Sequence, residues 1–335
     1  MTDLYPLLLL PEFHERVWGA HDLSAYYPSH KVGKEPIGEA WLTGEQCKVA
    51  NGPLVGRTLD QLAKQFGVEM NGTVAIVRDR FPLLMKILFP RERLSVQVHP
   101  DDATAQRIGQ PCGKTECWYV LEASPGAQIG LGLRPGTTPA AVEASIHNKN
   151  MEQLLNWIDV APGDMYYVDA GTVHAIGPGS VLLETQQNSD TTYRLYDYGR
   201  PRELHIRQGL EAMKERTHAG KVKSAGANGR IVLVSSPSFQ VDKIFLKQEK
   251  GFVTMESGRS SPHCLVGIQG CGVVEAEGAQ PVSFGKGESV VVPAGVKNYR
   301  VRPQWQFEYV RAMLPGANVA EPNAIPAHEL QAVRQ

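Results

Sequence analysis

"RERLSVQVHPDD", residues 91–102, is the stretch that decides the fold. Successive side chains of a β-strand point to opposite faces, so this stretch predicts a strand with one apolar face. The opposite face carries Ser95, Gln97 and His99, and the strand ends at Pro100. The apolar face fits a buried core, whereas the polar face needs partners from elsewhere in the chain.

The composition limits the class of protein. The chain has 335 residues, enough for two domains, with a formal net charge of −1. No strong field is available to attract nucleic acid or a membrane surface, so neither is expected as a partner. The first residues contain only four consecutive leucines and lack a basic start, which argues against a membrane span or signal peptide. Five cysteines without a CxxC motif indicate a reduced, cytoplasmic setting.

Short strands with glycine-rich turns dominate the rest of the chain, and the 33 glycines and 23 prolines suit them. This pattern predicts a mainly β protein of sandwich or barrel architecture. Helical patterns are confined to a small region, at about 50–67, 137–158 and 203–216. The polar segment 217–229 has the composition of a linker. We therefore predict two domains, 1–220 and 221–335.

An internal repeat supports two related β-domains. "PGDMYYVDAGTVHAIG" (162–177) aligns without gaps with "KGESVVVPAGVKNYRV" (286–301). Each copy has a glycine-acid turn, a strand and an Ala-Gly turn. His174 of the first copy is matched by Asn298 in the second, so a metal-capable histidine is expected in the first domain only.

Four residues of the first domain form a candidate metal site. Gln97 and His99 share one strand face, Glu116 opens the strand "ECWYVLEA", and His174 follows the turn "VDAGTV". Two imidazoles, a carboxylate and an amide oxygen suit zinc and leave room for substrate or water. Taken singly, each residue is equally explained as a satisfied polar group, and Glu116 as a solubilising residue at a strand edge.

Four motifs together resemble the type I mannose-6-phosphate isomerases, a metal-dependent family of the cupin superfamily. They are "SVQVHPDD", "GKTECWYV", "AGTVHAIG" and "NSDTTYRLYDYGR", and the resemblance runs from about residue 11 to residue 315. The length is similar to that of the short bacterial form. The resemblance implies a catalytic cupin domain at 1–220 and a metal-free cupin-like domain at 221–335, both of jelly-roll fold. One departure is Thr115, where many relatives have proline.

The activity implied by this resemblance is the interconversion of mannose 6-phosphate and fructose 6-phosphate with one Zn²⁺ per chain. The metal ligands carried over are Gln97, His99, Glu116 and His174. Arg194 falls at the position of the catalytic arginine, and its alternative is a structural ion pair with Asp190 or Asp197. The resemblance also places Lys86 and Ser95 near the phosphate of the substrate, in keeping with the affinity of a dianion for a lysine and a hydroxyl group.

The reaction needs further groups. An aldose–ketose isomerase moves a proton between C1 and C2 through an enediolate, so it requires a base. Glu184 lies in a core strand and is either this base or a paired carboxylate, and Asp190 is a candidate for a proton relay. Lys114 either polarises the sugar oxygens or is an exposed turn residue. Arg200 supports either the substrate or the fold, and Glu39 is as consistent with packing as with the pocket.

Two other classes stay open at this point. Two histidines and a carboxylate are also the ligands of an iron oxygenase, although that chemistry does not explain Arg194, Lys86 and Lys114 together. Alternatively, the protein binds a sugar phosphate without turnover. The oligomeric state has no clear signal in the sequence, and we favour a monomer.

Overall fold

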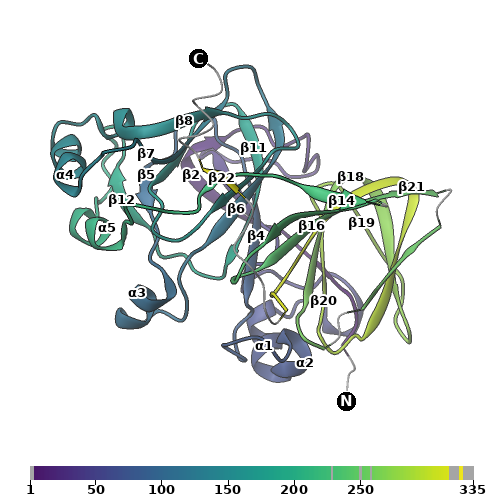
Figure 1. Ribbon diagram of the computed structural model, residues 1–335. Helices are drawn as coiled ribbons and strands as arrows, with labels where there is room; N and C mark the ends of the chain where they lie inside the picture. Colours follow the sequence, from purple (N-terminus) through teal and green to yellow (C-terminus); the bar gives the residue numbers. More distant parts are fainter. Residues whose placement is uncertain (1–3, 228, 249–250, 257–258, 317–323, 327–335) are drawn as a thin grey trace.

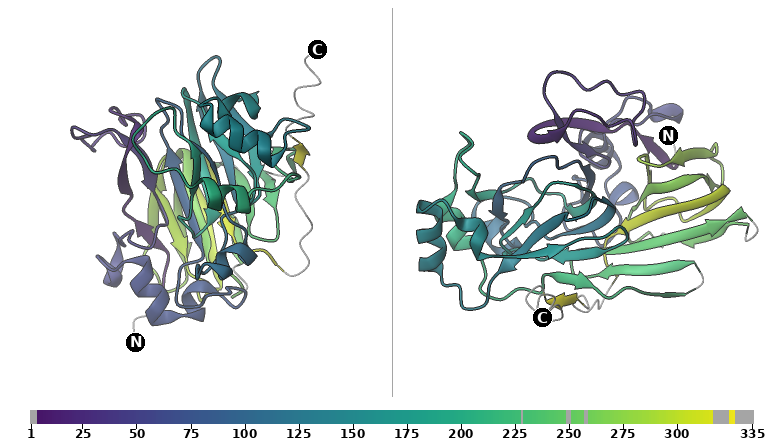
Figure 2. Two further views of the ribbon diagram at one scale, coloured as in Figure 1. Left: turned by 90° about the vertical axis from the view of Figure 1, so that its left-hand side faces the viewer. Right: turned by 90° about the horizontal axis from the view of Figure 1, so that it is seen from above.

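The computed structural model describes residues 4–227, 229–248, 251–256, 259–316 and 324–326. Three antiparallel sheets form the framework of this part of the chain (Figure 1). The prediction of a mainly β protein with cupin-like jelly-roll architecture is confirmed. We call the eight- and five-stranded sheets the first β-unit, and the nine-stranded sheet the second β-unit. Figure 2 shows the two units from the side and from above.

The first β-unit is a sandwich. Its larger sheet has the strand order β2 (Glu12–Ala20), β3 (Ile37–Trp41), β4 (Leu83–Leu88), β11 (Ser180–Gln187), β6 (Glu116–Ala123), β9 (Met165–Val168), β13 (Gly220–Val222), β22 (Ala324–Pro326). Its smaller sheet has the order β12 (Tyr193–Tyr196), β5 (Val96–Val98), β10 (His174–Ile176), β7 (Gln128–Leu133), β8 (Leu155–Asp159). Buried apolar side chains such as Trp118 and Ile129 fill the space between the two sheets.

The second β-unit is one curved sheet with its own apolar core, which includes Leu265 and Phe284. Its order is β1 (Leu7–Leu9), β20 (Ser289–Val292), β18 (His263–Ala276), β21 (Asn298–Met313), β16 (Gln240–Lys247), β15 (Arg230–Ser235), β14 (Ala225–Ala227), with β17 (Val253–Glu256) on β21 and β19 (Val282–Gly285) on β18. A further core joins the two units, because alternate residues of β6 face opposite ways: Cys117 points toward β16 and β18, and Trp118 points into the first unit.

Each β-unit contains a strand from the far end of the chain. Strand β1 pairs with β20 in the second unit, and β22 pairs with β13 in the first. The segment that we expected to be a linker, 217–229, instead contains strands β13 and β14. The division at residue 220 stays a prediction, and these pairings show that the two parts exchange their end strands.

The helices are few and short: α1 (Leu59–Phe66), α2 (Val68–Asn71), α3 (Asp102–Arg107), α4 (Pro139–His147), α5 (Ile206–Ala212) and the 3₁₀ turns η1 (Gly52–Leu54) and η2 (Met151–Leu154). Thr58 and Gln61 form a capping box at the start of α1. The helical pattern at 137–158 is divided into α4 and η2, and the segment ends in strand β8. Helices α4 and α5 cover the outer face of the smaller sheet (Figure 1).

The two copies of the repeat adopt the same local structure. Gly163 and Gly287 both have positive φ, 90° and 81°, as the turn requires. In each copy the following acid accepts a backbone hydrogen bond from the residue three positions earlier: Asp164 from Ala161 N, and Glu288 from Gly285 N. The strands that follow, β9 and β20, then pair with β6 and β18. The repeat therefore marks equivalent places in the two β-units.

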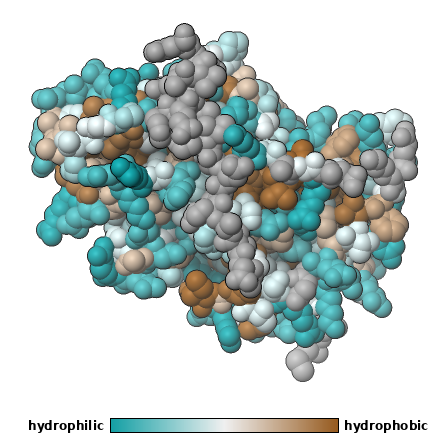
Figure 3. Space-filling model, in the orientation of Figure 1, coloured by the Kyte–Doolittle hydropathy of each residue, from teal (hydrophilic) through white to brown (hydrophobic). Residues whose placement is uncertain are grey.

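The surface matches the composition. On the face drawn in Figure 3, apolar residues lie in small groups separated by hydrophilic ones. Among the described residues, no helix is long and apolar enough to cross a membrane.

Candidate active site

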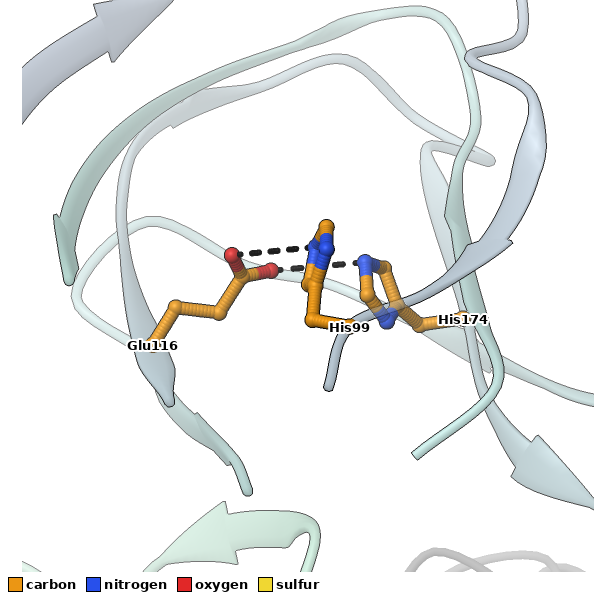
Figure 4. A group of neighbouring side chains, drawn as sticks. All are labelled: His99, Glu116 and His174. Atoms are coloured by element: carbon orange, nitrogen blue, oxygen red, sulfur yellow. Dashed lines mark ion pairs between the residues drawn. The ribbon is translucent and has the colours of Figure 1, made fainter. Parts of the chain in front are cut away.

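Three predicted ligands meet inside the first β-unit. His99 follows β5, Glu116 begins β6 and His174 begins β10, and their ligand atoms all lie within 4.8 Å of one another (Figure 4). Each imidazole Nε2 is 3.4 Å from a different oxygen of the Glu116 carboxylate. All three side chains are buried. Such a set of two imidazoles and a carboxylate is typical of a zinc or iron site.

Local structure brings these residues together. The pairing of β10 with β5 sets His174 opposite Gln97. Two residues after His99, Asp101 caps helix α3, since its side chain accepts a hydrogen bond from Thr104 N at 2.9 Å. The polar face seen in the sequence of β5 therefore points at the start of β10.

Backbone carbonyls orient both imidazoles. The Nδ1 of His99 lies 3.0 Å from Thr191 O, and the Nδ1 of His174 lies 2.9 Å from Thr172 O. A carbonyl only accepts, so each Nδ1 carries the proton and each Nε2 keeps a free lone pair. Burial lowers the pKa of His174 to about 4 and holds that of His99 well below its usual value, with a contribution from Lys114. Neutral imidazoles are the form that binds a metal ion.

Gln97 completes the predicted ligand set. Its side-chain amide lies 3.2 Å from His174 Nε2 through the nitrogen, and its oxygen accepts a hydrogen bond from Ser95 at 3.2 Å. A metal ion beside His174 would be bound by the amide oxygen. Rotation of the Gln97 amide group exchanges its nitrogen and oxygen and so brings the oxygen to that side.

A chain of buried charges leads away from the cluster. The Lys114 ammonium contacts the Glu116 carboxylate, lies 3.0 Å from His99 Nε2 and is 3.5 Å from Glu184. Lys86 lies 3.2 Å from Glu184. Lys114 is therefore a buried residue of the site and not an exposed turn lysine.

The pKa values along this chain follow from burial and pairing. Burial and the neighbouring Glu116 raise the pKa of Glu184 despite its two lysine neighbours. Burial alone would lower the pKa of Lys86, but Glu184 and Glu39 raise it above its usual value. Burial would raise the pKa of Glu39, but Lys86 and Arg16 bring it down to about 2. The environment therefore shifts the pKa of Glu184 upward and that of Glu39 downward.

These groups open onto a cavity of about 350 Å³. Eight of the predicted site residues line it: Lys86, Ser95, Gln97, Lys114, Glu116, Glu184, Asp190, Arg194. Arg194 is the cross-strand neighbour of Gln97. Its Nη1 donates to Glu203 O at 2.8 Å, and among the described residues it makes no ion pair with Asp190 or Asp197. The alternative that Arg194 is held in such a pair is therefore not supported.

Comparisons with known proteins agree with this arrangement. Residues 7–121 match the model of the type I phosphomannose isomerase catalytic domain. The mannose-6-phosphate isomerase of Streptococcus mutans is 36% identical over 90% of this chain and 95% of its own length. The chain belongs to the type I phosphomannose isomerase family. A probable mannose-6-phosphate isomerase of Bacillus subtilis is 34% identical, over 90% of this chain and 98% of its own length.

The structures of phosphomannose isomerases show the same fold. The crystal structure of the mannose 6-phosphate isomerase from Bacillus subtilis superimposes with a TM-score of 0.80 at 32% identity, over 92% of this chain and 99% of that chain. A mannose 6-phosphate isomerase bound with zinc and yttrium superimposes with a TM-score of 0.74 at 16% identity, over 93% of this chain and 100% of that chain.

Arg200, which we predicted to bind substrate, lies outside the lining of the cavity. The Arg200 guanidinium contacts Asp197, Glu92 and the carbonyl of Arg93, and Arg200 is not among the residues lining the cavity. Its role in the fold is thus visible, whereas its predicted contact with substrate stays a prediction.

Several cavity residues were missed by sequence reasoning. Arg16 and Trp18 come from β2, Thr192 from the loop before β12, and Arg202 from the loop after it. Glu39, which the sequence left open, also lines the cavity and contacts Arg16 and Lys86. The spacing of Arg16 and Trp18 was the available signal, since residues two apart share a strand face.

Proposed function

We propose that this protein interconverts mannose 6-phosphate and fructose 6-phosphate, using one Zn²⁺ per chain. The single observation that carries the proposal is that the cluster of His99, Glu116 and His174 reaches, through Glu116, the cavity that Arg194 and Glu184 also line. Two neutral imidazoles and a carboxylate converge beside Arg194 and a raised-pKa carboxyl group, in a chain of the phosphomannose isomerase family. The activity named for its relatives is thus matched by groups suited to it.

The donor set fits a zinc ion. Gln97, His99, Glu116 and His174 would hold it, with nitrogen and oxygen ligands that zinc accepts. When bound, zinc supplies Lewis-acid stabilisation of negative charge on the sugar oxygens. A protein of the same fold has been crystallised with zinc and yttrium. An iron ion would also accept these ligands, and metal analysis distinguishes the two.

Glu184 is the proposed base. In the forward direction its carboxylate takes the proton from C2 of the open-chain sugar, the C1–C2 double bond forms and O1 gains a proton. The base then returns its proton to C1 as O2 loses one. A raised pKa suits a group that must both accept and release this proton. Asp190, which lines the same cavity, is the proposed relay between the hydroxyl groups.

Positively charged side chains are proposed to stabilise the negative charges of the substrate and of the reaction intermediate. Arg194 cannot be deprotonated in the working range of pH, so its charge is available throughout the reaction. Lys114, which lines the cavity, is proposed to polarise the sugar oxygens. Lys86 and Ser95 line the cavity and are the proposed contacts of the substrate's phosphate end.

A coupled assay for fructose 6-phosphate tests this function. We expect turnover of mannose 6-phosphate that disappears with a chelator and returns with added Zn²⁺. Turnover that resists exhaustive metal removal would contradict the metal dependence, and binding without product would leave the alternative of a sugar-phosphate-binding protein. Activity retained under anaerobic conditions would exclude an oxygenase.

We further propose that the protein acts as a monomer in the cytoplasm and that residues 221–335 form a metal-free domain. Light scattering during size-exclusion chromatography measures the mass directly. A value near 36.7 kDa is expected for a monomer. A stable mass of twice this value would contradict it.

A further inference from the structure

One end of the cavity is rich in arginine. Arg194 and Arg202 both line it, and both come from the segment "RLYDYGRPR" (194–202) in β12 and the following loop. Lys86 and Lys114 also line the cavity, but Glu39, Glu116 and Glu184 pair with those lysines. The arginines therefore have fewer carboxylate partners than the lysines.

Asp197 fixes Arg202 in position. This buried carboxylate accepts hydrogen bonds from Arg202 Nε at 2.6 Å and Nη2 at 2.7 Å, a two-point contact of fixed geometry. It also accepts a bond from Arg200 Nη1 at 3.1 Å. Among the described residues, no hydrogen bond is made by Arg202 Nη1. The pair therefore presents a rigid guanidinium with donor groups to spare.

Arg194 adds unused hydrogen-bonding capacity at the same end. Its Nε is buried and has no hydrogen-bond partner among the described residues. Burial and the nearby Arg202 lower the pKa of Arg194, which shows that two like charges are held close together. Asp197 pairs with Arg200 and Arg202, and Arg200 also pairs with Glu92. Arg194 makes no ion pair among the described residues, so its positive charge is left without a carboxylate partner.

Ser95 belongs to this end as well. The pairing of β12 with β5 sets Tyr196 opposite Val96, and the next residues along the two strands are Asp197 and Ser95. Ser95 lines the cavity, as do Arg194 and Arg202. A hydroxyl group and guanidinium donors are the groups that recognise a phosphate dianion.

We propose that Arg202, held by Asp197, contacts the phosphate group of the substrate and determines the preference for phosphorylated sugars. The assignment rests on the proposed function for the identity of the substrate, but it concerns an anion subsite that is measurable without turnover. The proposal assigns different roles to the two arginines that bind Asp197. Arg202 lines the cavity, whereas Arg200 pairs with Glu92 at the surface.

Equilibrium binding of two non-reacting probes tests this assignment. Sorbitol 6-phosphate and sorbitol differ only in the phosphate group, and isothermal titration with each gives the phosphate's share of the affinity. In Arg202→Gln we expect the affinity for sorbitol 6-phosphate to fall by about tenfold to a hundredfold, as for a lost charge-assisted bond. The affinity of this variant for sorbitol should stay within about threefold of the parent protein's affinity. Arg202→Lys, which keeps the charge but not the planar fork, should lose less.

Two further variants make the outcome decisive. Arg207→Gln removes an exposed arginine of α5 that pairs with Glu211, and it should bind both probes like the parent protein. Arg200→Gln removes the other arginine bound to Asp197. The proposal is overturned if Arg202→Gln binds sorbitol 6-phosphate normally, or if Arg200→Gln loses as much affinity as Arg202→Gln. A general defect in folding would weaken both probes together.

Turnover and probe binding, measured on the same proteins, distinguish a failure of this proposal from a failure of the proposed function. If the parent protein forms no fructose 6-phosphate but its binding of sorbitol 6-phosphate depends on Arg202, the anion subsite stands and the isomerase function fails. If the parent protein is an active isomerase and Arg202→Gln binds sorbitol 6-phosphate normally, the function stands and the subsite fails.

Discussion

Two charge clusters, each centred on a buried side chain, occupy matching places in the two β-units, with their signs reversed. In the first unit Lys86 lies between Glu39 and Glu184, at 3.7 and 3.2 Å. In the second unit Asp242 lies between Arg230 and Arg311, at 3.1 Å from the former and in direct contact with the latter. We call these the lysine-centred cluster and the aspartate-centred cluster.

Strand register establishes that the places match. Glu184 is opposite Lys86 across β11 and β4, and Arg311 is opposite Asp242 across β21 and β16. The third member stands on the next strand in both units, with Glu39 opposite Leu88 and Arg230 opposite Ile244. These last partners lie two residues beyond the central charge in each case.

The surroundings of the clusters differ more than the clusters do. The lysine-centred cluster opens onto the cavity and adjoins Glu116 through Lys114. At the place of Glu116 the second unit has His263, whose Nδ1 lies 2.8 Å from the Tyr299 hydroxyl group. Arg311 also contacts the Met255 sulfur at 2.9 Å. The same backbone thus supports a reactive site in one unit and a packed interior in the other.

Loss of a histidine should have the largest effect, and only in the first unit. His99→Ala or His174→Ala should empty the metal site and lower kcat/KM by about a thousandfold or more, since each ligand of an open site is needed. Metal analysis and the coupled assay measure both results. His263→Asn is the matched variant, and it should keep metal and turnover. Full metal content in either first-unit variant would refute the ligand assignment.

Breaking the aspartate-centred cluster should lower stability without touching the chemistry. Arg311→Met leaves Asp242 buried with one half-exposed partner, so we expect a loss of about 3–4 kcal/mol in the free energy of unfolding. Denaturant titration measures it. Arg302→Met, on the same strand, removes an exposed pair with Glu275 and should cost less than about 1 kcal/mol. Equal losses would mean that burial of the cluster is unimportant.

Arg194→Lys should affect turnover but not the metal. Lysine keeps the positive charge and loses the planar fork, so kcat should fall by about a hundredfold, on the order of 3 kcal/mol of transition-state stabilisation. Steady-state kinetics and metal analysis on the same sample separate the two effects. The second-unit variant Arg311→Lys should keep its turnover. Near-normal kcat in Arg194→Lys would make this arginine structural.

The smallest effect concerns pH. Burial lowers the pKa of His263 from 6.5 to about 3, helped by Arg311 and Arg230. Between these values the unfolded chain binds a proton that the folded chain does not, so stability is lost as the pH falls through this window. His263→Gln should therefore reduce the slope of stability against pH by up to about 1.4 kcal/mol per unit. If the slope of stability against pH between pH 6 and 4 is the same in His263→Gln as in the parent protein, the pKa of His263 is not lowered by burial.

The sequence was sufficient for the centre of the site. His99, Glu116 and His174 could be predicted because each stands at the end or beginning of a strand, where alternation and glycine turns leave little freedom. The resemblance supplied Arg194 and Lys86, and the structure places both in the cavity wall. Glu184 was recognisable because a carboxylate in an apolar strand needs either a partner or a function.

The rim of the site could not be predicted in the same way. Arg16 meets Glu39 only because β2 and β3 pair in one particular register, which the sequence of either strand does not reveal. The choice between Arg200 and Arg202 depends on a turn in which Tyr198 and Gly199 have positive φ, 55° and 82°. For tyrosine this conformation is rare, so sequence patterns do not anticipate it.

The crossing of the end strands has a consequence for synthesis on the ribosome. Leu7–Leu9 are translated roughly 280 residues before their partners in β20. At about 5–20 residues per second, β1 waits on the order of a quarter of a minute to a minute for them. During that interval three leucines that will be largely buried need shelter, either in the exit channel's surroundings or with a chaperone. The edge of the second sheet that β1 forms can thus be completed only after β20 has been translated.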